Sequence, residues 1–170
     1  AKINDLGVTT AKLTAAAVTA PKIAAQPGCR VYNNANISVA SSTWTAITFN
    51  TENFDTDTMH STVSNTSRIT FTTARVYLVI GSFVMENSST ANFHLARILL
   101  NGVTDLDEGG LAGVTATASP RVQVAGIYSY AAADYVELQA YQEGSGAINV
   151  LGGGGYANYS PVFSAIRLGA

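Results

Sequence analysis

The chain has 170 residues, of which 47% are hydrophobic and only 12% are charged, and its net charge is −2. So few charges argue against a helical bundle, whose outer surface needs many Glu, Lys and Arg residues. The slightly acidic balance gives no electrostatic footprint for nucleic acid, and no apolar run is long enough to span a bilayer. The length fits one β-rich domain with some additional residues.

Residues 1–26 contain an internal repeat of ten residues, in which Lys2, Lys12 and Lys22 each precede an apolar residue. A fixed period indicates a small unit that is stacked repeatedly. Such a unit has too few apolar residues to bury a core except against parallel copies. Because Pro21 argues against one long helix, we predict that this segment is the end of a fibrous stalk. A disordered Ala/Thr linker is the alternative.

The Pro27-Gly28 step marks a boundary, because this pair forms turns and stops the repeat. Residues 27–170 are therefore predicted to be a separate head domain of short strands between turn clusters, which is typical of a sandwich or barrel. We expect about eight strands, at 30–39, 43–50, 67–84 (two strands with a corner at 73–75), 93–100, 121–130, 134–141 and 161–168. Long loops are expected at 50–66, 103–119 and 144–156.

The segment Ser67–Val84 is the centre of this pattern. Ile69 and Phe71 alternate with polar residues, as in a half-buried strand. The run Val76–Ile80 is continuously apolar and rich in β-branched and aromatic residues, which predicts a strand buried on both faces. One face of an antiparallel sandwich normally meets water, so a second subunit is expected to cover the outer face of this strand.

Few residues in the chain indicate catalysis. Cys29 is the single cysteine and cannot form an internal disulfide; we predict a small buried hydrophobe. A reactive thiol would need His60 or His94 beside it. No nucleophile elbow or phosphate-binding loop motif is present, so we predict a protein that is not an enzyme.

Asp105, Asp107 and Glu108 are the strongest chemical signal in the sequence. Three carboxylates within four residues, on a predicted loop, match the oxygen ligands that calcium prefers. We therefore name them as a candidate calcium site, and calcium is the one cofactor that we consider. A solvated acidic loop is the alternative interpretation.

Three segments carry a resemblance to a known family: Phe71–Val79, Ala133–Ala140 and Tyr159–Ser164. They resemble three strands of the C1q/TNF superfamily of trimeric jelly rolls. The first is an aromatic strand followed by a small-residue corner, the second is a strand of the form Gly-Asp-x-Val-x-Leu, and the third is the closing strand. More closely, the chain resembles C1q-like domains at the ends of bacteriophage tail or head fibres, over about residues 29–169. The repeats before the head also resemble those of phage fibres. Arg75 and Ala133 stand where such domains usually have glycine.

The resemblance implies an all-β antiparallel jelly-roll sandwich of about eight to ten strands, which assembles as a homotrimer behind a short stalk. Calcium near the apex occurs in some C1q-like trimers. Our candidates for the trimer interface are Val76, Tyr77, Val79 and Tyr135. The alternative for these residues is the ordinary core of one subunit.

The resemblance also implies a binding function: the head of a virion fibre, exposed on the virion surface, that recognises a glycan or protein on the host cell. The stalk would connect it to other virion proteins; contact with nucleic acid and insertion into a membrane are not expected. Loop candidates for receptor contact are Asn87, Asn92, Tyr156 and Asn158. The alternatives are a structural trimerisation, capping or capsid-decoration module, and a bacterial surface adhesin.

Overall fold

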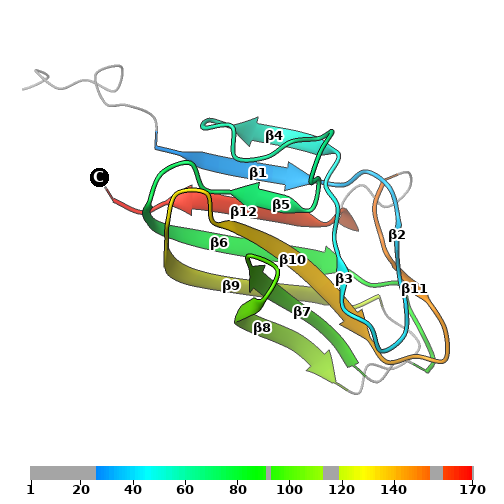
Figure 1. Ribbon diagram of the computed structural model, residues 1–170. Coiled ribbons are helices and arrows are strands. Elements are labelled where there is room, and N and C mark those ends of the chain that lie inside the picture. Colours follow the sequence, from blue (N-terminus) through cyan, green and yellow to red (C-terminus); the bar gives the residue numbers. More distant parts are fainter. Residues whose placement is uncertain (1–25, 91–92, 113–118, 154–158, 170) are drawn as a thin grey trace, which may run out of the picture.

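The computed structural model describes residues 26–90, 93–112, 119–153 and 159–169 (Figure 1). The predicted stalk lies outside these residues except for Gln26. The described part of the chain forms twelve strands: β1 (Gly28–Tyr32), β2 (Ile37–Val39), β3 (Thr45–Ala46), β4 (Thr51–Asp55), β5 (Arg68–Thr70), β6 (Arg75–Val84), β7 (Phe93–Leu100), β8 (Thr104–Ala112), β9 (Arg121–Tyr130), β10 (Tyr135–Gln142), β11 (Ile148–Val150) and β12 (Val162–Arg167).

The strands form two main sheets. The first, the β6 sheet, has the order β4-β1-β12-β6-β9. The second, the β10 sheet, has the order β3-β10-β7-β8, with β5 also paired to β10, and a separate ribbon pairs β11 with β2. All of these pairings are antiparallel. The predicted antiparallel sandwich is therefore confirmed.

Strand β6 alternates along its length rather than being buried on both faces. Tyr77, Val79, Gly81 and Phe83 point into the sandwich and are buried, whereas Leu78, Ile80 and Ser82 between them are half-buried on the other side. A Cβ at Gly81 would lie 2.5 Å from Cδ1 of Leu138 in the opposite sheet, so any larger residue would displace that buried side chain. Within a single chain, the outer face of β6 thus remains open to solvent.

The core between the sheets is built around aromatic rings. Phe71 stacks on Tyr130 with ring centroids 3.9 Å apart, and Tyr77 lies 4.6 Å from Phe71. Phe49 stacks on Phe163 at 5.7 Å, which ties a loop residue to the closing strand. The predicted corner at 73–75 carries the chain from β5 in one sheet to β6 in the other.

Three predicted loops were wrong in part, because each contains a strand. Strand β4 lies within 50–66, β8 within 103–119 and β11 within 144–156. β4 and β8 are edge strands of their sheets, and edge strands often carry charges rather than an apolar alternation. The composition of these segments therefore resembled that of loops.

Asn101 and Gly102 form the turn of the hairpin between β7 and β8. Both residues have positive φ, 52° and 74°, and the Val103 amide donates to the Leu100 carbonyl at 3.1 Å. Positive φ at both central residues is the geometry that matches the twist of paired strands.

The described chain begins and ends at the same end of the sandwich, because Arg167 donates from its amide to the Pro27 carbonyl at 3.0 Å. At the opposite end (Figure 1) lie the connections after β6 and β10 and the β2–β11 ribbon. We call residues 85–90, 143–147 and 151–153 the distal loops. No helix within the described ranges is long and apolar enough to cross a membrane.

Candidate functional site

The outer face of the β6 sheet, turned away from the core, presents side chains in cross-strand rows. Leu78 of β6 is directly opposite Ile166 of β12 on one side and Ile127 of β9 on the other. Side chains paired in this way contact one another across a sheet. Three aliphatic residues from three adjacent strands therefore form one continuous row, which we call the apolar row.

The apolar row is unusually exposed for its composition. Ile127 is 60% exposed and Ile166 is 44% exposed. Val76, at 39%, and Leu168, at 38%, extend the row toward the chain termini, where the Leu168 amide donates to the Val76 carbonyl at 2.9 Å. A contiguous apolar surface of this kind marks an interaction site more often than scattered exposed residues do.

The structure divides the four predicted trimer contacts among three environments. Val76 lies on the outer face of the β6 sheet beside the apolar row, as expected of a contact residue. Tyr77 and Val79 were wrong as contact residues, because both are fully buried between the sheets of one chain. Their phase along β6 is inward, and Tyr77 uses its hydroxyl to donate to the Thr73 carbonyl at 3.1 Å.

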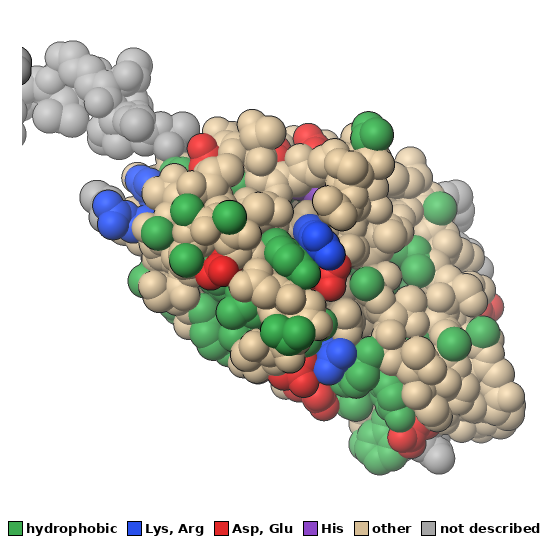
Figure 2. All heavy atoms as spheres, viewed as in Figure 1, with side chains coloured by type: hydrophobic (Ala, Val, Ile, Leu, Met, Phe, Trp, Pro, Cys, Tyr) green, Lys and Arg blue, Asp and Glu red, His purple; other side chains and the backbone are tan. Residues whose placement is uncertain are grey.

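Tyr135 lies on the outer face of the β10 sheet, on the opposite side of the sandwich from Val76. The Arg68 guanidinium covers its ring at 3.9 Å from the centroid, and Arg68 also pairs with Glu137 at 3.3 Å. A second stack places Arg97 over Trp44 at 4.3 Å. On the face shown in Figure 2, positive and negative side chains are interspersed among uncharged groups.

Ile127 and Ile166 were missed in the sequence, although a signal for them exists. In β9, Val122, Val124 and Tyr130 are buried and share even positions. Ile127 is out of phase with them and therefore points outward. A large aliphatic residue on the solvent side of an otherwise regular strand could have identified this surface.

The distal loops contain Asn87, the one described member of the four predicted receptor contacts, and its side chain is exposed. Asn92, Tyr156 and Asn158 lie outside the described residues. Two of the distal loops are side by side: the Ser145 amide donates to the Thr90 hydroxyl at 3.1 Å. The polar loop after β4 is not part of this group, because Thr56 is tied to Gly28 near the termini.

The acidic cluster lies in strand β8 instead of a loop. Asp105 pairs with Arg97 at 2.9 Å. A bulge in the β7–β8 ladder leaves Asp107 opposite Ile98 and Asp105 opposite Leu99. No three acidic, His or Cys side chains in the described part of the chain come close enough together to hold a metal ion. The geometry therefore gives the predicted calcium site no support.

Cys29 is fully buried, as predicted. Burial, together with the nearby carboxylates of Asp55 and Glu52, raises the pKa of its thiol to about 12, so the thiolate is disfavoured. His60 is engaged with the Glu52 carboxylate at 3.0 Å and the Thr66 carbonyl at 3.3 Å. These contacts do not provide an activated nucleophile.

His94 is fully buried in β7, and its ring nitrogens are not satisfied by hydrogen bonds within the described residues. Neither ring nitrogen has a hydrogen-bond partner among the described residues, and Oε1 of the buried cross-strand neighbour Gln142 has none either. Burial lowers the pKa of the His94 imidazole. Burial therefore disfavours the protonated form of the ring.

Comparison with solved structures shows a C1q/TNF-like jelly roll. The globular domain of the zebrafish complement 1qA protein superimposes with a TM-score of 0.63 at 14% identity, over 85% of this chain and 98% of that one. Murine APRIL gives 0.63 at 9% identity, over 85% and 100%. Eiger TNF from S. frugiperda gives 0.57 at 10% identity, over 85% and 93%. No family model and no curated protein sequence matches the chain.

Proposed function

We propose that this chain is the subunit of a homotrimeric binding head, without catalytic activity, that recognises a receptor on a cell surface. The observation that carries the proposal is the apolar row. Ile166, Leu78 and Ile127 expose aliphatic surface across three adjacent strands of a sheet whose other face already forms the core. Covering this surface removes apolar area from water, which is the main favourable term in subunit association.

The apolar row on this face is covered by two further copies of the same chain. The row lies toward the end of the sandwich where the described chain begins, at Gln26. In the sequence, the ten-residue repeats of residues 1–26 come directly before the head, and their sparse apolar residues favour burial against parallel partner chains. A trimer about an axis beside the β6 sheet provides both parallel stalk chains and a cover for the row.

Receptor contact is assigned to the distal loops, at the opposite end from the stalk. Residues 85–90 and 143–147 are held together by the Thr90–Ser145 hydrogen bonds, and Asn149 is fixed by the Glu86 carboxylate at 2.7 Å. Three copies around an axis give avidity, so each site can be weak. The resemblance of the repeats and the head to phage fibres supports a place at the tip of a virion fibre.

Sedimentation velocity tests the assembly, and host adsorption tests the binding. We expect a particle of about three times the 17.7 kDa subunit. We also expect that saturating free protein slows adsorption of the virus to its host. A monomeric particle would refute the trimer. A trimer that neither binds host cells nor slows adsorption would refute the receptor function and favour a structural capping module.

A further inference from the structure

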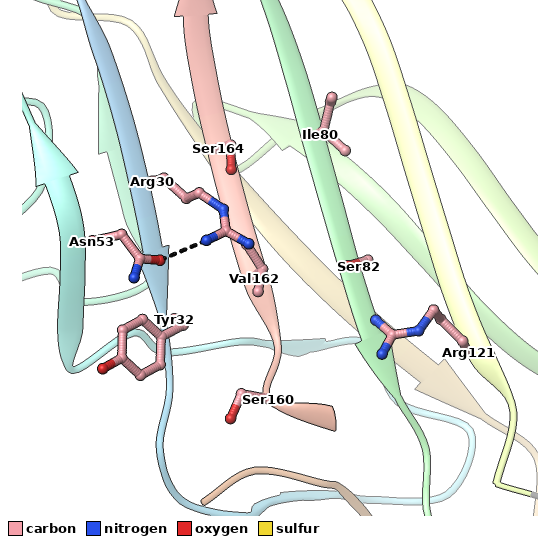
Figure 3. Close-up of a pocket in the computed structure, with 9 residues that line it drawn as sticks. All are labelled: Arg30, Tyr32, Asn53, Ile80, Ser82, Arg121, Ser160, Val162 and Ser164. Carbon is pink, nitrogen blue, oxygen red and sulfur yellow. Dashed lines mark hydrogen bonds between the residues drawn. The ribbon is translucent and has the colours of Figure 1, made fainter. Parts of the chain in front are cut away.

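A cavity of about 670 Å³ lies on the outer face of the β6 sheet, beyond the apolar row from the termini (Figure 3). All five strands of the sheet, together with the segment before β12, contribute to it. Its nine lining residues are Arg30, Tyr32, Asn53, Ile80, Ser82, Arg121, Ser160, Val162 and Ser164. Pockets of this size accommodate ligands from a single sugar ring to a drug-sized molecule.

The lining carries two positive charges and no negative one. Arg30 of β1 and Arg121 of β9 extend from opposite sides, and their guanidinium groups point toward each other over β12 and β6 (Figure 3). Nη1 of Arg30 is held by the neutral Oδ1 of Asn53 at 2.8 Å. Two guanidinium groups that converge in one concave site favour an oxyanion, because each can form charge-assisted hydrogen bonds to it.

The remaining lining is suited to a sugar ring. Three serine hydroxyls, from Ser82, Ser160 and Ser164, can donate to or accept from the hydroxyls of a ligand. Tyr32 offers a half-buried aromatic ring, and Ile80 and Val162 form an apolar floor for the C–H face of a sugar. In Figure 3, Val162 and Ser82 lie between the two arginines, and the other groups lie farther along the strands.

We infer that this pocket binds an acidic saccharide unit, with Arg30 and Arg121 holding its carboxylate or sulfate group. The inference rests on the proposed binding function and names the class of receptor that this function would recognise. The pocket also extends to Ser160, which is close to the distal loops, since the Gly153 amide donates to its hydroxyl at 3.4 Å. A saccharide enters from that end when the apolar row is covered by neighbouring subunits.

The test is a calorimetric titration of the full chain with a sulfated, uronic-acid-containing heparin disaccharide. Cellobiose is the neutral control and inorganic sulfate is the control for the anion alone, all at one ionic strength. We expect saturable binding of the heparin disaccharide, at least about tenfold tighter than that of sulfate, with no binding of cellobiose. Arg30→Gln and Arg121→Gln should each weaken binding about tenfold or more.

Arg75→Gln is the matched control, because it removes the same charge from the same sheet at an exposed position outside the pocket. Unchanged melting temperatures would show that the variants fold. The proposal is overturned if the disaccharide does not bind, if both pocket variants bind like Arg75→Gln, if sulfate binds as tightly as the disaccharide, or if cellobiose binds equally well.

The outcomes separate this inference from the proposed function. Sedimentation of the same samples reports the trimer independently of the pocket. If wild-type protein and Arg121→Gln block host adsorption equally well, the proposed receptor function is supported and the role of the pocket is refuted. A monomer that binds the disaccharide, with the loss expected in the variants, would retain the pocket and refute the trimer.

Discussion

Replacement of Ile127 by aspartate is the most direct test of the apolar row. Ile127 is 60% exposed in the single chain, and its side chain points away from the core. Full burial of an aliphatic side chain contributes about 1.5–3 kcal/mol. Covering the exposed part of Ile127 therefore contributes about 1–2 kcal/mol in each subunit.

A trimer contains the substitution three times, so lost burial alone weakens assembly by about 3–6 kcal/mol. This corresponds to at least about a hundredfold increase in the dissociation constant. The cost of placing three carboxylates in a dry interface adds to this loss. We therefore expect Ile127→Asp to sediment as a folded monomer at a concentration where the wild-type chain is trimeric.

Sedimentation velocity with circular dichroism on the same samples measures assembly and folding together. Val63→Asp is the matched control, because Val63 is 90% exposed on the loop between β4 and β5 and is not part of the apolar row. It should remain trimeric. An intact trimer in Ile127→Asp would refute the assignment of this face to the subunit interface, whatever the state of the control.

Four further predictions concern the fold itself. Gly81→Ala should lower the free energy of unfolding by about 1–3 kcal/mol in urea titrations, because its Cβ would overlap the buried Leu138 side chain. Ala133→Gly should leave stability unchanged or raise it by up to about 1 kcal/mol, because φ is 71° at this alanine. His94→Gln should reduce the loss of stability on acidification below pH 6.5, since the folded-state pKa of His94 is lowered from that value. Cys29 should react with a thiol reagent only after unfolding, because burial raises its pKa to about 12.

The sign of the His94 effect follows from proton linkage. Because burial lowers the folded-state pKa, the unfolded chain binds more protons in the window between pH 6.5 and that lower value. Stability is therefore complete above pH 6.5 and falls as the pH passes down through the window. Equal acid sensitivity of wild type and His94→Gln would contradict this account.

Each remaining prediction has its own opposing outcome. A Gly81→Ala chain as stable as wild type would show that Leu138 moves aside without cost. A marked loss of stability in Ala133→Gly would mean that the turn relies on the alanine methyl group. Rapid modification of Cys29 in the folded chain would show that the thiol is reached from solvent.

Two positions, 75 and 133, carry another residue where the resembling family usually has glycine, and the family resemblance alone did not predict their backbone conformations. Arg75 and Ala133 both replace an expected glycine, yet Arg75 does not have positive φ, whereas Ala133 does. Ala133 sits in the turn before β10, where its amide donates to the Phe71 carbonyl at 2.8 Å. Only the course of the chain through three dimensions separates the position that needs a left-handed backbone from the one that does not.

The sequence alone determined the class of fold, because alternating apolar residues, turn residues and the Asn101-Gly102 hairpin are local features with local physical causes. It also identified the segment 67–84, which contains β6, as the centre of the strand pattern. It could not assign the faces of that strand, since five consecutive apolar residues fit either phase of a period-two pattern. Tyr77 and Val79 were placed in the core by the position of the β10 sheet.

The candidate binding surfaces were decided only by tertiary structure. The apolar row joins Leu78, Ile127 and Ile166, and the pocket joins Arg30 to Arg121, residues that are far apart in the sequence. Antiparallel pairing and its register bring them together, and a shift by one residue would turn each of them to the other face. The sequence therefore specified the strands, and the order and register of those strands specified the sites.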